Sequence, residues 1–174
     1  MSDFFPQGYT APTAGGGYLK FEVGETRFRA ISKPIIGWQG WATTPDGGSK
    51  PVRSKDRMTD ASLRDVKPFW AFAVLHKGEV KILEVTQKSV MQAIQALSLN
   101  PEWGSLFSFD MIVTRTGADK NSTKYTVTPC PKKQLDEAAV AIVKKAKIDL
   151  DALWINGDPM AQAATELVTD SLPF

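Results

Sequence analysis

Hydrophobic and polar positions alternate with a two-residue period over much of the chain before Cys130, as in β-strands with one buried face. A long first strand is predicted over about 26–42, bent near Pro34 because proline cannot donate to a β-ladder. Two later strands are predicted at 107–116 and 124–128, joined by a polar loop. Turn formers and charged residues fill 43–67, which predicts a long loop and leaves open an extended piece around Val52.

Two apolar runs, 69–76 and 79–86, lie on either side of Lys77-Gly78. A two-residue connection that contains glycine predicts a tight β-hairpin, because glycine readily adopts a positive φ angle. The turn also fixes the register of the two strands. It predicts cross-strand pairs between Phe72 and Leu83, Trp70 and Val85, and Ala73 and Ile82.

Helical spacing appears after the hairpin. Thr86 is the expected N-cap of a helix that ends at Asn100-Pro101, and its apolar positions are Val90, Met91, Ile94 and Leu97. A second helical stripe extends from Leu135 to Ala146, and 148–154 is predicted to form a short third helix.

A helix between the third and fourth of five antiparallel strands is the layout of the OB fold. The prediction is therefore a mainly β fold, a single five-stranded OB barrel, with a C-terminal helical extension and a flexible tail. The alternative is an α+β sheet with the helix on one face. The predicted parts are a flexible N-terminal arm at 1–17, the OB domain at 18–130, the helical extension at 131–157 and the tail at 158–174.

Composition narrows the function classes. Hydrophobic residues make up 43% of the 174 residues and charged residues 23%, which is typical of a folded globular protein. One cysteine, Cys130, and one histidine, His76, provide neither a disulfide framework nor an all-Cys/His zinc site. No stretch approaches the roughly 18 apolar residues of a membrane span. We expect a protein of the cytoplasm with no cofactor, no metal and no membrane association.

Motifs for catalysis are missing from the sequence. It contains no Gly-x-Ser-x-Gly, no Gly-x-x-x-x-Gly-Lys and no His-Glu-x-x-His. His76 is expected at the surface of a hairpin end, and Cys130 is expected to act as a small hydrophobic residue. The prediction is that the chain is not an enzyme.

Basic and aromatic residues gather around the loop 43–67. Single-stranded nucleic acid is bound by a basic groove for the phosphates and by aromatic rings on which bases stack. The stacking candidates are Trp38, Trp41, Phe69 and Tyr125, whereas Trp70, Phe72 and Phe109 are expected in the core. The phosphate candidates are Lys50, Arg53, Lys55, Arg57, Lys81, Arg115 and Lys124, and Arg64 and Lys67 belong to the same basic loop.

The last residues, Asp170-Ser171-Leu172-Pro173-Phe174, form an acidic, aromatic end without basic residues nearby. Asp170, Leu172, Pro173 and Phe174 are predicted to insert into a pocket of a partner protein. This tip resembles the C-terminal tip of bacterial and bacteriophage single-stranded DNA-binding proteins, although Ser171 replaces an acidic residue.

The body of the chain resembles bacteriophage single-stranded DNA-binding proteins with one OB fold. The similar segments are Tyr18 to Trp41, Lys50-Pro51-Val52-Arg53-Ser54, Phe69-Trp70-Ala71-Phe72, Ile82 to Lys88 and Tyr125-Thr126-Val127. The resemblance implies sequence-independent coating and protection of single-stranded DNA during replication or recombination, in the host cytoplasm if a phage encodes the chain. It also implies that the tip recruits replication or recombination proteins and competes with DNA for the groove.

Two alternatives use the same body: a replication adaptor whose OB module binds proteins, and an OB module that binds RNA or an oligosaccharide. Preference for DNA over RNA, site size and the formation of a homo-oligomer stay open at the level of sequence.

Overall fold

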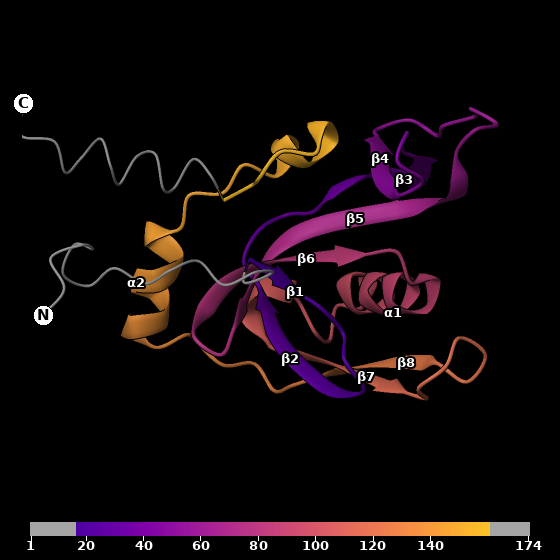
Figure 1. Cartoon of the computed structure of the whole chain (residues 1–174). Coiled ribbons are helices and arrows are strands. Elements are labelled where there is room, and N and C mark those ends of the chain that lie inside the picture. Colours follow the sequence, from indigo (N-terminus) through magenta and orange to yellow (C-terminus); the bar gives the residue numbers. More distant parts are fainter. Residues whose placement is uncertain (1–16, 161–174) are drawn as a thin grey trace, which may run out of the picture.

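Figure 1 shows the computed structural model, in which residues 17–160 are described. This range holds eight strands: β1 (Tyr18–Leu19), β2 (Gly24–Ala30), β3 (Ile35–Thr43), β4 (Ser49–Ser54), β5 (Arg64–His76), β6 (Glu79–Val85), β7 (Met111–Thr116) and β8 (Lys124–Pro129). Its helices are α1 (Lys88–Leu99), α2 (Glu137–Lys145) and the 3₁₀ helices η1 (Leu106–Ser108) and η2 (Leu150–Ile155). The chain is mainly β, as predicted, with α1 placed between two strands.

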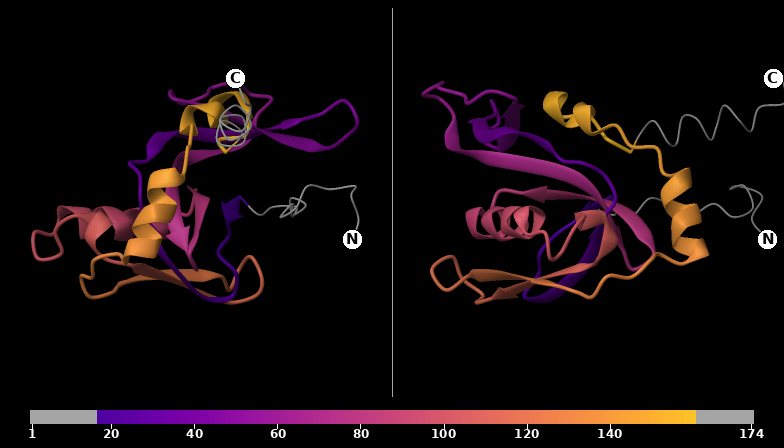
Figure 2. Two further views of the ribbon diagram at one scale, coloured as in Figure 1. Left: turned by 90° about the vertical axis from the view of Figure 1, so that its left-hand side faces the viewer. Right: turned by 180° about the vertical axis from the view of Figure 1, so that it is seen from behind.

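The strands form one open sheet rather than a closed five-stranded barrel. Its order is β1-β6-β5-β2-β7-β8, and β3 joins at β5 and carries β4 on its other side. A barrel would close if β6 met β8, but the free edge of β6 is already paired in parallel with β1 through Tyr18 and Leu19. Figure 1 and the right view of Figure 2 show α1 between the β5–β6 and β7–β8 parts of the sheet.

The additional strands arise in two places. The single strand predicted over 26–42 is two strands, because the chain turns between Ala30 and Ile35 around Pro34, which has no N–H to donate. The predicted loop 43–67 contains β4, which forms a hairpin with β3 from Trp38↔Ser54 to Thr43↔Ser49. This β3–β4 hairpin projects away from the rest of the sheet (left view of Figure 2).

The hairpin predicted at Lys77-Gly78 is confirmed with its register. Phe72 pairs with Leu83, Trp70 with Val85 and Ala73 with Ile82. Lys77 and Gly78 have φ angles of 49° and 77°, the left-handed pair that a two-residue turn of this kind requires.

The two faces of the β5–β6 hairpin contact different cores. Residues that pair directly share a face, so the inner face carries Phe72, Val74, Leu83 and Val85, and the outer face carries Phe69, Ala71, Ala73, Ile82 and Glu84. The inner face packs in the larger hydrophobic cluster with buried side chains of α1 (Val90, Met91 and Ile94), β2 (Phe28) and β7 (Met111 and Val113), and with Phe109.

The outer face is partly covered by a strap, residues 148–160, which comes from far along the chain. Leu153 is fully buried there against Phe69, Ala71, Ala73 and Ile82. Asn156 Nδ2 donates to the Pro51 carbonyl at 3.0 Å, which ties the strap to β4. Figure 2 shows η2 of the strap next to the β3–β4 hairpin.

Tight packing at Gly37 fixes the strap in place. A Cβ atom added at Gly37 would lie 2.5 Å from Cη2 of Trp154 and still closer to the Ser54 carbonyl oxygen. The indole therefore rests on the bare backbone of β3, a close approach that only glycine permits.

At both ends of the described range, ordered contacts continue past the predicted boundaries of the folded part. The fully buried Pro159 accepts a hydrogen bond from Asp149 N at 2.9 Å, so packing continues past the predicted end of the helical extension at 157. At the other end, Gly17 O accepts from Ile82 N at 2.8 Å. The remainder of the predicted N-terminal arm lies outside the described residues.

Two helix details differ from prediction or add to it. The N-cap of α1 is Gln87 rather than Thr86, and it makes no side-chain capping bond. α2 is capped by Asp136, whose side chain accepts from Ala139 N at 2.7 Å, and it has no buried side chain.

Across residues 17–160, no helix has the length and apolar character needed to cross a bilayer.

Candidate nucleic-acid interface

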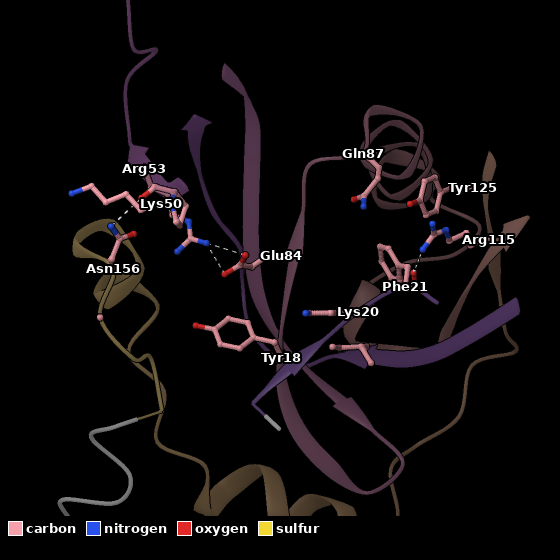
Figure 3. Close-up of a pocket in the computed structure, with 13 residues that line it drawn as sticks. Tyr18, Lys20, Phe21, Lys50, Arg53, Glu84, Gln87, Arg115, Tyr125 and Asn156 are labelled. Carbon is pink, nitrogen blue, oxygen red and sulfur yellow. Dashed lines mark hydrogen bonds and ion pairs between the residues drawn. The ribbon is translucent and has the colours of Figure 1, made fainter. Parts of the chain in front are cut away.

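A cleft of about 760 Å³ opens between the strap, β4 and the end of β7 (Figure 3). We name it the strap cleft. Four basic side chains and one carboxylate line it, together with aromatic rings from β1, β8 and the segment after β1. The lining is Tyr18, Leu19, Lys20, Phe21, Lys50, Pro51, Arg53, Glu84, Gln87, Arg115, Tyr125, Asn156 and Gly157.

A second cleft of about 450 Å³, the loop cleft, lies between β5 and the β7–β8 loop. It adds Lys67 and Lys120 to the basic lining, with Asp119 as its carboxylate. Arg115 and Tyr125 line both clefts, so the two clefts adjoin at these residues. Together they form a groove that extends from the strap and β4, past Glu84 on β6, to the β7–β8 loop.

The β7–β8 loop has a fixed shape at its end of the groove. Asp119 accepts hydrogen bonds from the backbone N–H groups of Asn121 and Ser122 at 3.0 and 2.8 Å. These bonds favour the charged carboxylate and lower the pKa of Asp119. The loop therefore presents Lys120 from an ordered turn.

Arg53 is firmly held within the strap cleft. Its Nη2 lies 3.0 Å from both carboxylate oxygens of Glu84, and its Nε donates to Gln39 Oε1 at 2.9 Å. The guanidinium also lies over the Phe69 ring, 4.9 Å from the centroid. The Arg53 side chain is only 8% exposed and is already paired with Glu84, so it has little surface left for an incoming phosphate.

Arg115 has unused hydrogen-bonding capacity at the junction of the two clefts. Its Nη1 donates to the Phe21 carbonyl at 3.0 Å. Its Nε is buried and has no hydrogen-bond partner among residues 17–160. A buried donor without a partner carries a free-energy cost, so Arg115 is held at this junction in a strained polar environment.

The structure brings four of the predicted site residues together in the strap cleft: Lys50, Arg53, Arg115 and Tyr125. They come from β4, β7 and β8. Tyr125 pairs directly with Arg115 across the β7–β8 ladder, and its ring lies 6.1 Å from that of Phe21. Contact of these residues with DNA stays a prediction.

The two candidate tryptophans of the hairpin lie on opposite faces. The β3–β4 ladder is unbroken between Trp38 and Trp41, and residues three apart in a strand point to opposite sides. Trp41 shares its face with Gln39, the cross-strand partner of Arg53. Trp38 is on the other face, where the Arg57 guanidinium lies 5.2 Å from its ring centroid. A single nucleotide therefore cannot stack on both rings.

The prediction that Phe69 offers a stacking surface is wrong. Its ring is fully buried on the outer face of β5. It packs edge-on against Trp154, with centroids 6.3 Å apart, under Leu153 of the strap. Alternation correctly places Phe69 away from the larger core, but the strap covers the face to which it points.

The other phosphate candidates lie apart from the groove lining. Lys55 and Arg57 are exposed after β4, and Lys124 is exposed on β8. Lys81 lines a different cleft, of about 910 Å³, beside the β5–β6 turn, and lies 3.8 Å from Glu79. The tip residues Asp170, Leu172, Pro173 and Phe174 lie outside the described residues.

Sequence reasoning missed several residues of the groove: Tyr18, Lys20, Phe21, Gln87, Lys120 and Asn156. The close spacing of two aromatic residues and one basic residue in Tyr18-Leu19-Lys20-Phe21 was a usable signal for the first three. Asn156 gave no such signal, because it reaches the groove only through the packing of the strap.

In the cleft that Lys81 lines, Asp110 pairs with two arginines. Asp110 Oδ1 accepts from Arg29 Nε at 2.7 Å and Asp110 Oδ2 accepts from Arg27 Nε at 2.8 Å. Burial alone would raise the pKa of Asp110, but the bonds from both arginines outweigh it and the pKa is lowered.

Among residues 17–160, no three His, Cys, Asp or Glu side chains gather as a metal site would require.

Comparisons of the chain with protein-family models, with curated proteins and with solved structures gave no match.

Proposed function

We propose that the chain binds single-stranded DNA in the groove, with the phosphates along its basic side chains and bases against its aromatic rings. Proteins that coat single strands combine these two features, because every base has a face that can stack and every nucleotide carries a charge. In the groove, Lys20, Lys50, Lys67, Arg115 and Lys120 would meet phosphates, and Tyr18 and Tyr125 would stack on bases.

Strand connectivity supports an OB fold as the finer description. The strands β2, β5, β6, β7 and β8 follow the sheet order β6-β5-β2-β7-β8, and α1 lies between β6 and β7 in the chain. This is the order expected of a five-stranded Greek-key barrel left open between its third and fifth strands. On this view, β1 occupies the open edge, and β3 and β4 are additions between the first two barrel strands.

The position of the groove is the observation that carries the proposal. OB folds bind oligonucleotides on the face of their second and third strands, between the loop that joins strands one and two and the loop that joins strands four and five. The corresponding parts of this chain are the outer face of β5–β6, the β3–β4 hairpin and the β7–β8 loop. The groove lies between them, and its lining is rich in basic and aromatic residues.

The biological role that we propose follows the resemblance stated for the sequence. The chain would protect single strands during replication or recombination, and the tip with Asp170, Leu172, Pro173 and Phe174 would recruit replication proteins. A phage-encoded chain would do so in the host cytoplasm.

The direct test is a fluorescence-anisotropy titration of a dye-labelled oligo(dT) with the full chain. Phosphate contacts release counterions, so we expect the affinity to fall by about tenfold to a hundredfold between about 50 and 200 mM salt. Absence of binding at low salt, with a folded circular-dichroism spectrum, would refute the proposal. A parallel titration with oligo(rU) measures any preference for RNA.

Competition by the tail needs a chain shortened at the right place. Because Pro159 is buried and Met160 packs against the smaller cluster, the shortened chain must end at Met160. We expect this chain to bind oligo(dT) at least as tightly as the full chain. Weaker binding would show that residues 161–174 assist the groove instead of competing with DNA.

A further inference from the structure

Glu84 is the single carboxylate among the residues that line the strap cleft, and it lies among four basic side chains. It comes from the outer face of β6, where it pairs with Ala71. Its side chain is 26% exposed and lines the cleft. A negative charge at this point repels phosphates, which a groove that binds only the backbone would avoid.

The Glu84 carboxylate is held in one position. Both of its oxygens lie 3.0 Å from Arg53 Nη2, and Arg53 is itself fixed by Gln39 and by the ring of Phe69. A carboxylate can accept about four hydrogen bonds, so the pairing with Arg53 leaves acceptor capacity toward the cleft. Burial raises the pKa of Glu84, while the Arg53 guanidinium works in the opposite direction by stabilising the charge.

An aromatic ring lies next to this acceptor. Tyr18, at the start of β1, lines the same cleft, and Figure 3 shows its ring projecting toward the Glu84–Arg53 pair. Burial raises the pKa of Tyr18, and the nearby charge of Glu84 raises it further. A flat ring beside a fixed acceptor is the combination that holds a nucleobase by its face and by its edge.

We propose that Glu84 and Tyr18 form a subsite for a base with an amino group at the position of thymine O4, which gives the groove a preference for cytosine and adenine over thymine. Cytosine and adenine offer N4–H and N6–H donors to a carboxylate, whereas thymine presents the O4 carbonyl at that position. The phosphates then follow Lys20, Lys50 and Arg115 at the sides of the cleft. This inference rests on the proposed function and refines it, because coating of any sequence continues at the other positions.

The test compares labelled oligo(dC) and oligo(dT) of equal length at one salt concentration and neutral pH. A well-placed base contact discriminates against the wrong base, so we expect oligo(dC) to bind at least about fivefold more tightly than oligo(dT). Glu84→Gln replaces one carboxylate oxygen by an NH₂ group that can donate to thymine O4. It should bring the ratio of the affinities for oligo(dC) and oligo(dT) close to one. Glu79→Gln is the matched control: it removes the same charge from the same strand, at a side chain 71% exposed, and should leave the ratio unchanged.

A change in the oligonucleotide instead of the protein tests the subsite even if Glu84→Gln fails to fold. The wild-type chain is titrated with a deoxyadenosine strand and with a purine-deoxyriboside strand, which has the same ring system without the amino group. We expect weaker binding of the strand that lacks the amino group.

The outcomes separate the two proposals. Equal affinity of the wild-type chain for oligo(dC) and oligo(dT), or a ratio that survives Glu84→Gln, would overturn the subsite and leave single-strand binding intact. Failure to bind any oligonucleotide would overturn the proposed function itself.

Discussion

Arg115 of β7 and Tyr125 of β8 are direct cross-strand partners, and both line each of the two clefts that make up the groove. In the proposed complex, a guanidinium and a ring held on neighbouring strands by a backbone ladder would offer one nucleotide both a phosphate contact and a stacking surface. The ladder would then set the spacing of the two contacts.

Removal of the Arg115 side chain should weaken strand binding through loss of a phosphate contact. For Arg115→Ala we expect the slope of log K against log salt to become shallower by about 0.7, the value for one contact on a single strand. Lys124→Ala removes a charge from an exposed position outside the groove and should change neither slope nor affinity. Equal effects of the two variants would indicate that general surface charge governs binding.

Tyr125 should contribute through stacking and not through charge. We expect Tyr125→Ala to lower the affinity for oligo(dT) by about 1–3 kcal/mol, the range for one base–aromatic contact, with the salt slope unchanged. Tyr125→Phe should retain most of the affinity, and isothermal titration calorimetry at two salt concentrations checks both variants. A changed salt slope in Tyr125→Ala would contradict the stacking role.

Phe69 should matter for stability and not for binding. Phe69→Ala removes a fully buried ring from beneath the strap, and we expect a loss of about 3–5 kcal/mol in the free energy of unfolding by urea. The smaller change Phe69→Leu should leave enough folded protein for a titration and bind oligo(dT) like the wild type. Tenfold weaker binding by folded Phe69→Leu would restore Phe69 as a contact residue.

Asp110 should make stability depend on acid pH. Its pKa is lower in the folded chain than in the unfolded chain, where it is about 3.9. Its contribution to the free energy of unfolding is therefore fully present above the unfolded-state pKa and is lost as the pH falls through the folded-state pKa. Asp110→Asn leaves Arg29, whose side chain is 5% exposed, without its carboxylate. We expect a loss of about 3 kcal/mol at neutral pH.

The pH dependence of the Asp110→Asn variant provides the check. The free energy of unfolding is measured with urea from about pH 6 to pH 3. It should fall less steeply with decreasing pH for Asp110→Asn than for the wild type. Glu25→Gln, an exposed position on β2, should follow the wild-type curve. A parallel decline of all three proteins would place the acid sensitivity elsewhere.

The sequence predicted best what short-range geometry decides. A two-residue turn at Lys77-Gly78 was sufficient to fix the β5–β6 register, because each further pair follows from the turn. It predicted less well where distant segments meet. Alternation showed that Phe69 and Trp70 point to opposite sides of β5, but it did not show that a strap some eighty residues later covers the side of Phe69.

The open sheet has the same kind of cause. The edge of β6 is taken by the two residues of β1, too short a strand for periodicity to reveal. For the groove, charge and aromatic content identified Lys50, Arg53, Arg115 and Tyr125. The pairing of Arg53 with Glu84 follows only from the three-dimensional arrangement of β4 against β6.

The strap also sets the order in which the groove can be completed during synthesis. Asn156 and Gly157 form part of the wall of the strap cleft, and Asn156 holds β4 through the Pro51 carbonyl. Translation proceeds from the N-terminus, so a nascent chain displays all eight strands outside the ribosome before this wall exists. The strap cleft therefore acquires its last wall only after every strand that lines it has already emerged.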